Sequence, residues 1–103
     1  MITIIESPYA GTRETNIAYA RRALLDSLKR GESPFASHLL YTQVLDDSNR
    51  EEREQGIAAG LRLYAVASLC AVYSDMGVSP GMLKGIEVAR TFSVPVEYRS
   101  IGW

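Results

Sequence analysis

The sequence contains one cysteine and one histidine, Cys70 and His38, among its 103 residues. An internal disulfide needs a second cysteine, and a structural zinc site usually needs four cysteine or histidine ligands, so this chain forms neither. Cys70 lies in the apolar run LCAVY, which predicts a buried thiol in a strand. We therefore expect no metal ion and no cofactor.

The sequence also has no excess of charge of either sign and no long apolar segment. Eleven basic residues nearly balance twelve acidic ones, giving a formal net charge of −1 at pH 7, which argues against nucleic acid as the main partner. No apolar run approaches the ~18 residues that suggest a membrane span. The start MITIIES is too short and too weakly charged for a signal peptide. We expect a cytoplasmic protein with no membrane partner.

What the sequence does have is the composition of one folded domain. Hydrophobic residues make up 47% and charged residues 22% of the chain, as in ordinary globular proteins. A chain of this length forms one compact core, and neither repeats nor linker-like segments divide it. We expect a single domain over residues 1–103.

Short apolar runs alternate with helical patterns in the first half of the chain. The β-branched run at residues 2–5 predicts a first, central strand. Residues 12–31 predict a helix whose buried stripe holds Ile17, Ala20, Leu24 and Leu28. A weak strand at residues 35–37 precedes residues 38–52, whose pattern is too mixed for one regular element and whose length suggests a functional loop.

The second half continues this alternation. Residues 51–67 predict a helix with one stripe of Ile57, Leu61, Tyr64 and Ser68, and LCAVY predicts a strand buried on both faces. Ser79 and Pro80 predict the start of a helix that reaches about Phe92 and buries Met82, Ile86 and Ala89. Residues 94–98 predict the last strand, which Pro95 confines to a sheet edge or to pairing only at its start.

The alternation of strands and helices predicts an α/β fold with right-handed crossovers and a parallel sheet. Ligands bind beyond the carboxyl ends of such strands. The loops at residues 6–16, 37–47 and 74–82 should therefore meet at one rim.

These loops hold most of the chemically distinctive side chains. The start of the third helix can hold an anion through the amides of Gly81 and Met82, although a plainly capped helix is the alternative. Tyr9 and Tyr41 can stack on a base or ribose, or pack the rim. His38 can donate a hydrogen bond to a phosphate or hydroxyl, or be structural. Arg13 and Asn16 lie one helical turn apart and can face the same pocket. The alternative for Arg13 is a solvent-exposed side chain.

Taken in order, five motifs resemble the nucleoside 2-deoxyribosyltransferase-like superfamily, most closely its small bacterial and phage branch: SPYAGTRETNIAYARRA, SHLLYTQVLDD, REEREQGIAAG, GVSPGM and PVEYR. The resemblance runs from Ile4 to Arg99. It implies a flavodoxin-like three-layer sandwich with a four-stranded parallel sheet of order 2-1-3-4 and about three helices. It also implies a pocket for a nucleoside or nucleotide and cleavage of an N-glycosidic bond by a glutamate on the helix after the third strand.

At the position of that glutamate this sequence has Gly85. Relatives place the glutamate four residues before a small helix residue, which is Ala89 here. Glu87 points about 200° away from Gly85 and lies one turn from Lys84 and Arg90, so we expect it on a solvated face. A helical glycine costs about 1 kcal/mol relative to alanine, and more room for a ligand is one reason to keep it.

A carboxylate could instead have moved to Glu6, which ends the first strand where relatives usually have a small residue. Turns and caps explain Asp46, Asp47 and Asp75. The residues that we expect to contact a ligand are Ser7, Pro8, Tyr9, Arg13, Asn16, His38, Leu39, Tyr41, Ser79, Gly81, Met82 and Gly85.

Three functions follow from this pattern. The first is non-catalytic binding of a nucleotide or ADP-ribose-derived small molecule, in one version by a phage protein that sequesters a host nucleotide immune signal in the host cytoplasm. The alternative is a nucleoside deoxyribosyltransferase or nucleotide N-glycosidase that uses Glu6 or Glu87. The third is a structural interaction domain with a vestigial pocket.

The resemblance further implies a homo-oligomer with shared pockets, and the apolar residues Leu63, Tyr64 and Val66 suggest surface that one sheet face cannot cover. Trp103 would insert into a neighbour's site or pack on its own domain.

Overall fold

The computed structural model describes all 103 residues and contains one four-stranded parallel sheet in the order β2-β1-β3-β4. The strands are β1 (Ile2–Glu6), β2 (Ser33–Phe35), β3 (Leu69–Tyr73) and β4 (Val96–Arg99). The predicted α/β fold and strand order are confirmed. β1 is central as predicted, and β4, which Pro95 precedes, lies at an edge.

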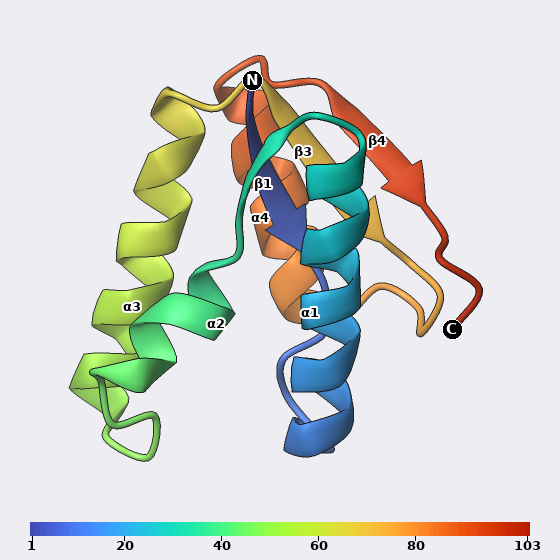
Figure 1. Cartoon of the computed structure of the whole chain (residues 1–103). Helices are drawn as coiled ribbons and strands as arrows, with labels where there is room; N and C mark the ends of the chain where they lie inside the picture. Colours follow the sequence, from blue (N-terminus) through green and yellow to red (C-terminus); the bar gives the residue numbers. More distant parts are fainter.

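Four α-helices and two short 3-10 turns connect the strands. They are α1 (Arg13–Lys29), α2 (Ser37–Leu40), η1 (Tyr41–Gln43), α3 (Arg50–Arg62), η2 (Leu63–Ala65) and α4 (Pro80–Thr91). In Figure 1, α1 crosses in front of the sheet, α4 lies behind it, and α3 stands to one side with α2 against its lower half. The helix beyond the expected three is α2, which begins at Ser37, the last residue of the predicted weak strand, and continues into the segment whose pattern was too mixed for one element. The weak strand itself lies two residues earlier than predicted, at Ser33–Phe35.

Each face of the sheet has its own apolar core because side chains alternate along the strands. On one face, Ile4, Cys70 and Val72 pack with the α4 stripe of Met82, Ile86 and Ala89. On the other, Ile5, Ala71 and Tyr73 pack with Tyr19 and Ala23 of α1. All five residues of β3 are buried, including the predicted buried thiol of Cys70.

The buried face of α1 differs from the predicted one. Ala20 is buried as expected, but Leu28 is 52% exposed, and the other buried positions are Asn16, Tyr19, Ala23 and Ser27. These polar side chains can be buried because each has a partner: Asn16 donates to the carbonyls of Tyr9 and Ala10, Tyr19 to Asp75, and Ser27 to Glu32. Hydrophobic periodicity alone could not identify a face held by polar contacts.

The predicted stripe of the second long helix is also only partly right. Tyr64 is buried in the core, whereas Ile57 is 54% exposed, and within α3 only Gly60 is buried. Tyr64 therefore does not add to the apolar surface that we expected on this helix, although Val66 does, at 62% exposure. None of the helices combines the length and hydropathy needed to cross a membrane.

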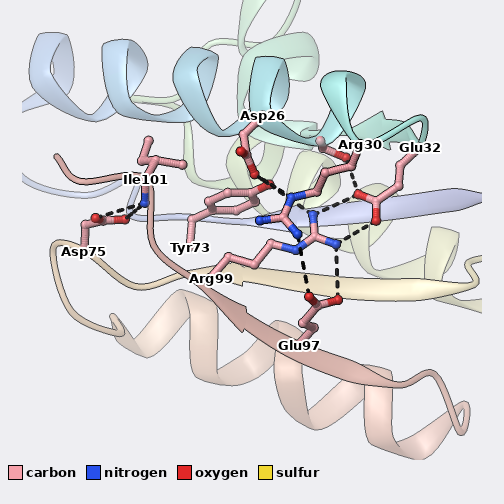
Figure 2. A network of polar contacts seen from close by, with 9 residues as sticks. Asp26, Arg30, Glu32, Tyr73, Asp75, Glu97, Arg99 and Ile101 are labelled. Carbon is pink, nitrogen blue, oxygen red and sulfur yellow. Dashed lines mark hydrogen bonds and ion pairs between the residues drawn. The ribbon is translucent and has the colours of Figure 1, made fainter.

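A buried arginine, Arg99, connects the edge strand β4 to the residues between α1 and β2, as Figure 2 shows. The Arg99 side chain is 2% exposed and pairs with Glu32 at 2.6 Å. It also donates to the hydroxyl of Tyr73 at 3.1 Å and to Glu97 at 3.2 Å. The hydrogen bond from Arg99 holds the pKa of Glu32 below its ordinary value. This network joins β4, β3 and the α1–β2 connection.

Asp75 anchors the C-terminal residues. Its carboxylate accepts hydrogen bonds from the backbone amides of Ile101, Gly102 and Trp103 and from the hydroxyls of Tyr19 and Ser100. The Trp103 ring packs edge-on against Tyr19 of its own chain, with centroids 5.3 Å apart. Trp103 thus packs on its own domain, which is one of the two placements predicted for it.

Candidate functional site

A cavity of about 610 Å³ opens at the carboxyl end of β1. Its walls come from β1 and the loop after it, from α2, η1 and α3 on one side, and from the start of α4 on the other. The volume lies within the range of small-molecule sites in proteins. The predicted rim is therefore a real cavity, and α3 contributes more of its wall than the sequence indicated.

Glu6 lies in this cavity wall at the last position of β1. Its Oε2 accepts a hydrogen bond from the Tyr64 hydroxyl at 2.5 Å, and the same hydroxyl lies 3.2 Å from Sγ of Cys70. Burial raises the pKa of Glu6 to about 7, although the hydrogen bond from Tyr64 acts to lower it. Glu6 is therefore a mixture of carboxylate and carboxylic acid at neutral pH. A strongly shifted carboxyl group in a cleft is typical of functional sites.

Gly85 faces the Glu6 carboxyl group from α4. A Cβ atom added at Gly85 would meet the carboxyl carbon and both oxygens of Glu6 closer than 3.0 Å. Gly85 is buried and is not part of the cavity wall. Our expectation that it makes room for a ligand is therefore corrected: the space that it leaves is filled by Glu6.

Ser7 and His38 form a second polar pair in the wall. Ser7 Oγ and His38 Nε2 are 2.8 Å apart, and the Tyr9 ring packs edge-on against the imidazole with centroids 6.1 Å apart. Burial lowers the pKa of His38 to about 4, so the ring is neutral at pH 7 and brings no positive charge to an anion. The pair can exchange hydrogen bonds with a neutral hydroxyl or amide of a ligand. The hydroxyl of Tyr9 is buried without a hydrogen-bond partner.

The start of α4 forms the opposite wall. Ser79 is the N-cap, as predicted, and its Oγ accepts from the Met82 amide at 3.3 Å. That amide is therefore occupied, and the Met82 side chain is core, so the anion-binding potential of this turn rests on the Gly81 amide. Lys84 and Arg53 add positive charge to the walls, while Asp47 and Glu52 add negative charge.

The structure brings only some of the predicted residues together. Ser7, Tyr9, His38, Tyr41, Ser79, Gly81 and Met82 line the cavity. The residues predicted to contact a ligand that are not part of the wall are Pro8, Arg13, Asn16, Leu39 and Gly85. Asn16 instead holds the loop through the carbonyls of Tyr9 and Ala10. Leu39 packs against the apolar core between the sheet and α1. Glu87 is exposed, as predicted.

Sequence reasoning missed the stripe of Gly56, Gly60 and Tyr64, all of which line the cavity. A Cβ at Gly60 would meet Ser37 closer than 3.0 Å, and one at Gly56 would lie 3.1 Å from Leu45. These glycines let α2 and the following turn approach α3 and close one side of the cavity. Their four-residue spacing, with Tyr64 four residues later, was a signal that could have been used.

The fold and this cavity define the class of protein: a small α/β domain with a ligand-sized cavity at the carboxyl end of a parallel sheet. Nowhere in the chain do three or more histidine, cysteine or acidic side chains cluster as metal ligands would. The chain belongs to the family described as domain of unknown function DUF7768, whose model matches residues 1–99.

Among solved structures, the chain is similar to a 2-deoxyribosyltransferase from Bacillus psychrosaccharolyticus, with a TM-score of 0.70 and 16% sequence identity. The match covers 97% of this chain and 72% of the other, and it supports the flavodoxin-like fold. No curated protein matches the sequence.

Proposed function

We propose that the cavity binds a nucleoside or nucleotide and that Glu6 acts on its N-glycosidic bond. The observation that carries this proposal is the position of the Glu6 carboxyl group, which lines the cavity and fills the space above Gly85. Gly85 is the position that corresponds, by the resemblance of the sequence motifs, to the reactive glutamate of deoxyribosyltransferase-like proteins. A carboxyl group is therefore present at this place, although it comes from β1 instead of α4.

The chemistry needs a carboxylate beside the anomeric carbon of the sugar. The ionised Glu6 would attack that carbon or stabilise the positive charge that develops there as the bond to the base breaks. The base leaves with the electron pair of the C–N bond and takes a proton from solvent. Water or a second free base then attacks the anomeric carbon, which releases the Glu6 carboxylate and completes hydrolysis or transfer. Because the pKa of Glu6 is about 7, the ionised fraction, and with it the rate, should increase as the pH rises through neutrality.

The other wall residues suit the remainder of such a ligand. Tyr9 and Tyr41 offer aromatic surface for a base, and the neutral Ser7–His38 pair offers hydrogen bonds to sugar hydroxyls. The Gly81 amide, Lys84 and Arg53 offer contacts for a phosphate, which favours a nucleotide over a free nucleoside.

The test is incubation of the purified protein with a panel of ribo- and deoxyribonucleosides and their 5′-monophosphates, followed by chromatography for released base. We expect turnover of at least one deoxynucleotide, and loss of that turnover in Glu6→Gln with ligand binding retained. Glu87→Gln is the matched control, because Glu87 is exposed and outside the cavity. Turnover that survives in Glu6→Gln would contradict the role of Glu6.

The second candidate is non-catalytic binding of a nucleotide or ADP-ribose-derived molecule, such as a phage protein would use to sequester a host signal. The raised pKa of Glu6 favours it, because the protonated fraction of Glu6 at neutral pH is a weak nucleophile. Mass spectrometry of small molecules released by heat from the purified protein tests this function. A retained nucleotide, together with no base release from the panel, would support binding over catalysis.

We also propose a homo-oligomer, because Ile57 in the cavity wall is 54% exposed and Val66, beyond η2, is 62% exposed. Sedimentation velocity measures this directly, and a monomer at all concentrations would contradict it.

A further inference from the structure

A chain of three side chains leads from the cavity wall into the apolar core. Glu6 comes from the end of β1, Tyr64 from η2 and Cys70 from β3. The Tyr64 hydroxyl lies 2.5 Å from Glu6 Oε2 and 3.2 Å from Cys70 Sγ. Tyr64 is 1% exposed and Cys70 is fully buried, so the contacts lie in the apolar core on this face of the sheet.

The direction of the hydrogen bonds among these three side chains depends on whether Glu6 is ionised. A tyrosine hydroxyl has one proton to donate, and an ionised carboxylate can only accept. When Glu6 is ionised, Tyr64 must donate to Glu6, and the hydrogen bond between Tyr64 and Cys70 must come from the thiol. Burial raises the pKa of Cys70 to about 11, so the thiol keeps the proton that this arrangement needs.

No other hydrogen bond or ion pair supports the carboxylate. The hydrogen bond from Tyr64 is the only one that reaches Glu6, and no basic side chain forms an ion pair with it. Other elements also place polar groups in the cavity wall: His38 from α2 is bonded to Ser7, and Lys84 comes from α4. Arg90 of α4 acts electrostatically on Cys70.

We propose that Tyr64 is the positioning residue for Glu6, holding its carboxylate toward the cavity, and that the Cys70 thiol orients the Tyr64 hydroxyl for this role. Only the expected effect on turnover rests on the proposed function, because the effect of Tyr64 on the pKa of Glu6 is present without substrate. The core packing of the Tyr64 ring fixes the hydroxyl, so the strand that carries Glu6 and the turn that ends α3 together define where the carboxylate lies.

The experiment follows the carboxyl carbon of Glu6 by ¹³C NMR across a pH titration in the full-length protein. Tyr64→Phe removes one hydroxyl and keeps the ring, and we expect the pKa of Glu6 to rise by on the order of one unit. Cys70→Ala should also raise the pKa of Glu6, but by less. Cys70→Ser keeps a hydrogen-bond donor, so the pKa of Glu6 in that variant should equal the wild-type value. Where turnover is measurable, the same shift lowers kcat/KM about tenfold on the acid side of the profile.

Tyr73→Phe is the matched control. Tyr73 is also a fully buried tyrosine, but its hydroxyl contacts Asp26 and Arg99 on the other face of the sheet, so its loss should leave the pKa of Glu6 unchanged. An unchanged pKa in Tyr64→Phe, or an equal shift in Tyr73→Phe, would overturn the inference. The titration needs no substrate, so it tests the role of Tyr64 even if the wild-type protein is inactive. An inactive wild-type protein would contradict only the proposed function.

Discussion

The carboxyl group of Glu6 in β1 occupies the volume into which a side chain at Gly85 of α4 would project. The two positions are therefore coupled by space: the site can hold a carboxyl group from the strand or from the helix, but not from both. This relationship gives the mid-helix glycine a structural reason and places an ionisable group beside the cavity.

Substitution of Gly85 should disturb Glu6 directly. In Gly85→Ala the new methyl group would meet the Glu6 carboxyl group closer than 3.0 Å and must displace it. We expect base release to fall at least tenfold, since misplacement of about 1 Å can cost 10²-fold. Gly81→Ala adds a methyl group to the same helix, with its nearest neighbour 3.9 Å away, and is the control for the NMR signal of Glu6. Equal effects of the two substitutions on that signal would contradict the coupling.

The coupling also predicts rescue by exchange. Glu6→Ala should abolish turnover, and adding Gly85→Glu in the same chain should restore part of it, because the space freed at position 6 can receive a carboxylate from α4. Chromatographic measurement of released base compares the two variants. A double variant that binds nucleotide as well as wild type but stays inactive would show that the direction of approach matters, and not only the place of the carboxylate.

The free energy of unfolding should depend on pH through Glu6. Its pKa in the folded protein, about 7, lies above the ordinary value of 4.5, so its contribution to stability is complete below pH 4.5 and is lost as the pH rises through 7. Glu6→Gln should remove this loss and gain on the order of 3 kcal/mol relative to wild type between pH 4.5 and 8.

Urea unfolding at several pH values measures this difference. His38 titrates in the opposite sense, from an ordinary 6.5 to about 4, but it is present in both proteins and its effect cancels in the comparison. A difference that is constant with pH would mean that Glu6 is not held in a low-dielectric site.

The Arg99–Glu32 pair should contribute much more to stability than an exposed pair. Arg99→Met leaves Glu32 partly buried without its partner, and we expect a loss of about 3–5 kcal/mol in unfolding free energy. Arg50→Ala removes a pair whose side chains are 84% and 62% exposed, and it should cost less than about 1 kcal/mol. Thermal and urea unfolding compare the two, and similar losses would show that burial does not distinguish them.

Asp75 should control the order of the C-terminus. Burial acts to raise its pKa, but hydrogen bonds from Ser100, Tyr19 and the tail amides hold the pKa well below the ordinary value. In Asp75→Ala these amides lose their acceptor, so we expect faster hydrogen exchange at residues 101–103 and a red shift of Trp103 fluorescence. Ser100→Ala, which removes a single hydrogen bond, should change both much less. Unchanged exchange in Asp75→Ala would mean that the Trp103–Tyr19 contact alone holds the tail.

Residues close together in the sequence carried the correct predictions. The run LCAVY, the Ser79 cap and the stripe of Met82, Ile86 and Ala89 each express a local preference or a period, and each is found as predicted. The predicted stripe of α1 was wrong at Leu28 because partners distant in sequence, such as Asp75 for Tyr19, decide which polar groups can be buried.

By itself, the sequence determined the order of the strands and helices, the parallel sheet and the rim where three loops meet, because periodicity, caps and turns act over a few residues. Only the tertiary structure decided that Glu6 fills the space above Gly85, that Tyr64 reaches the same carboxyl group from 58 positions away, and that α3 closes the cavity. Such contacts depend on how strands and helices pack against one another, and no local pattern in the chain specifies those distances.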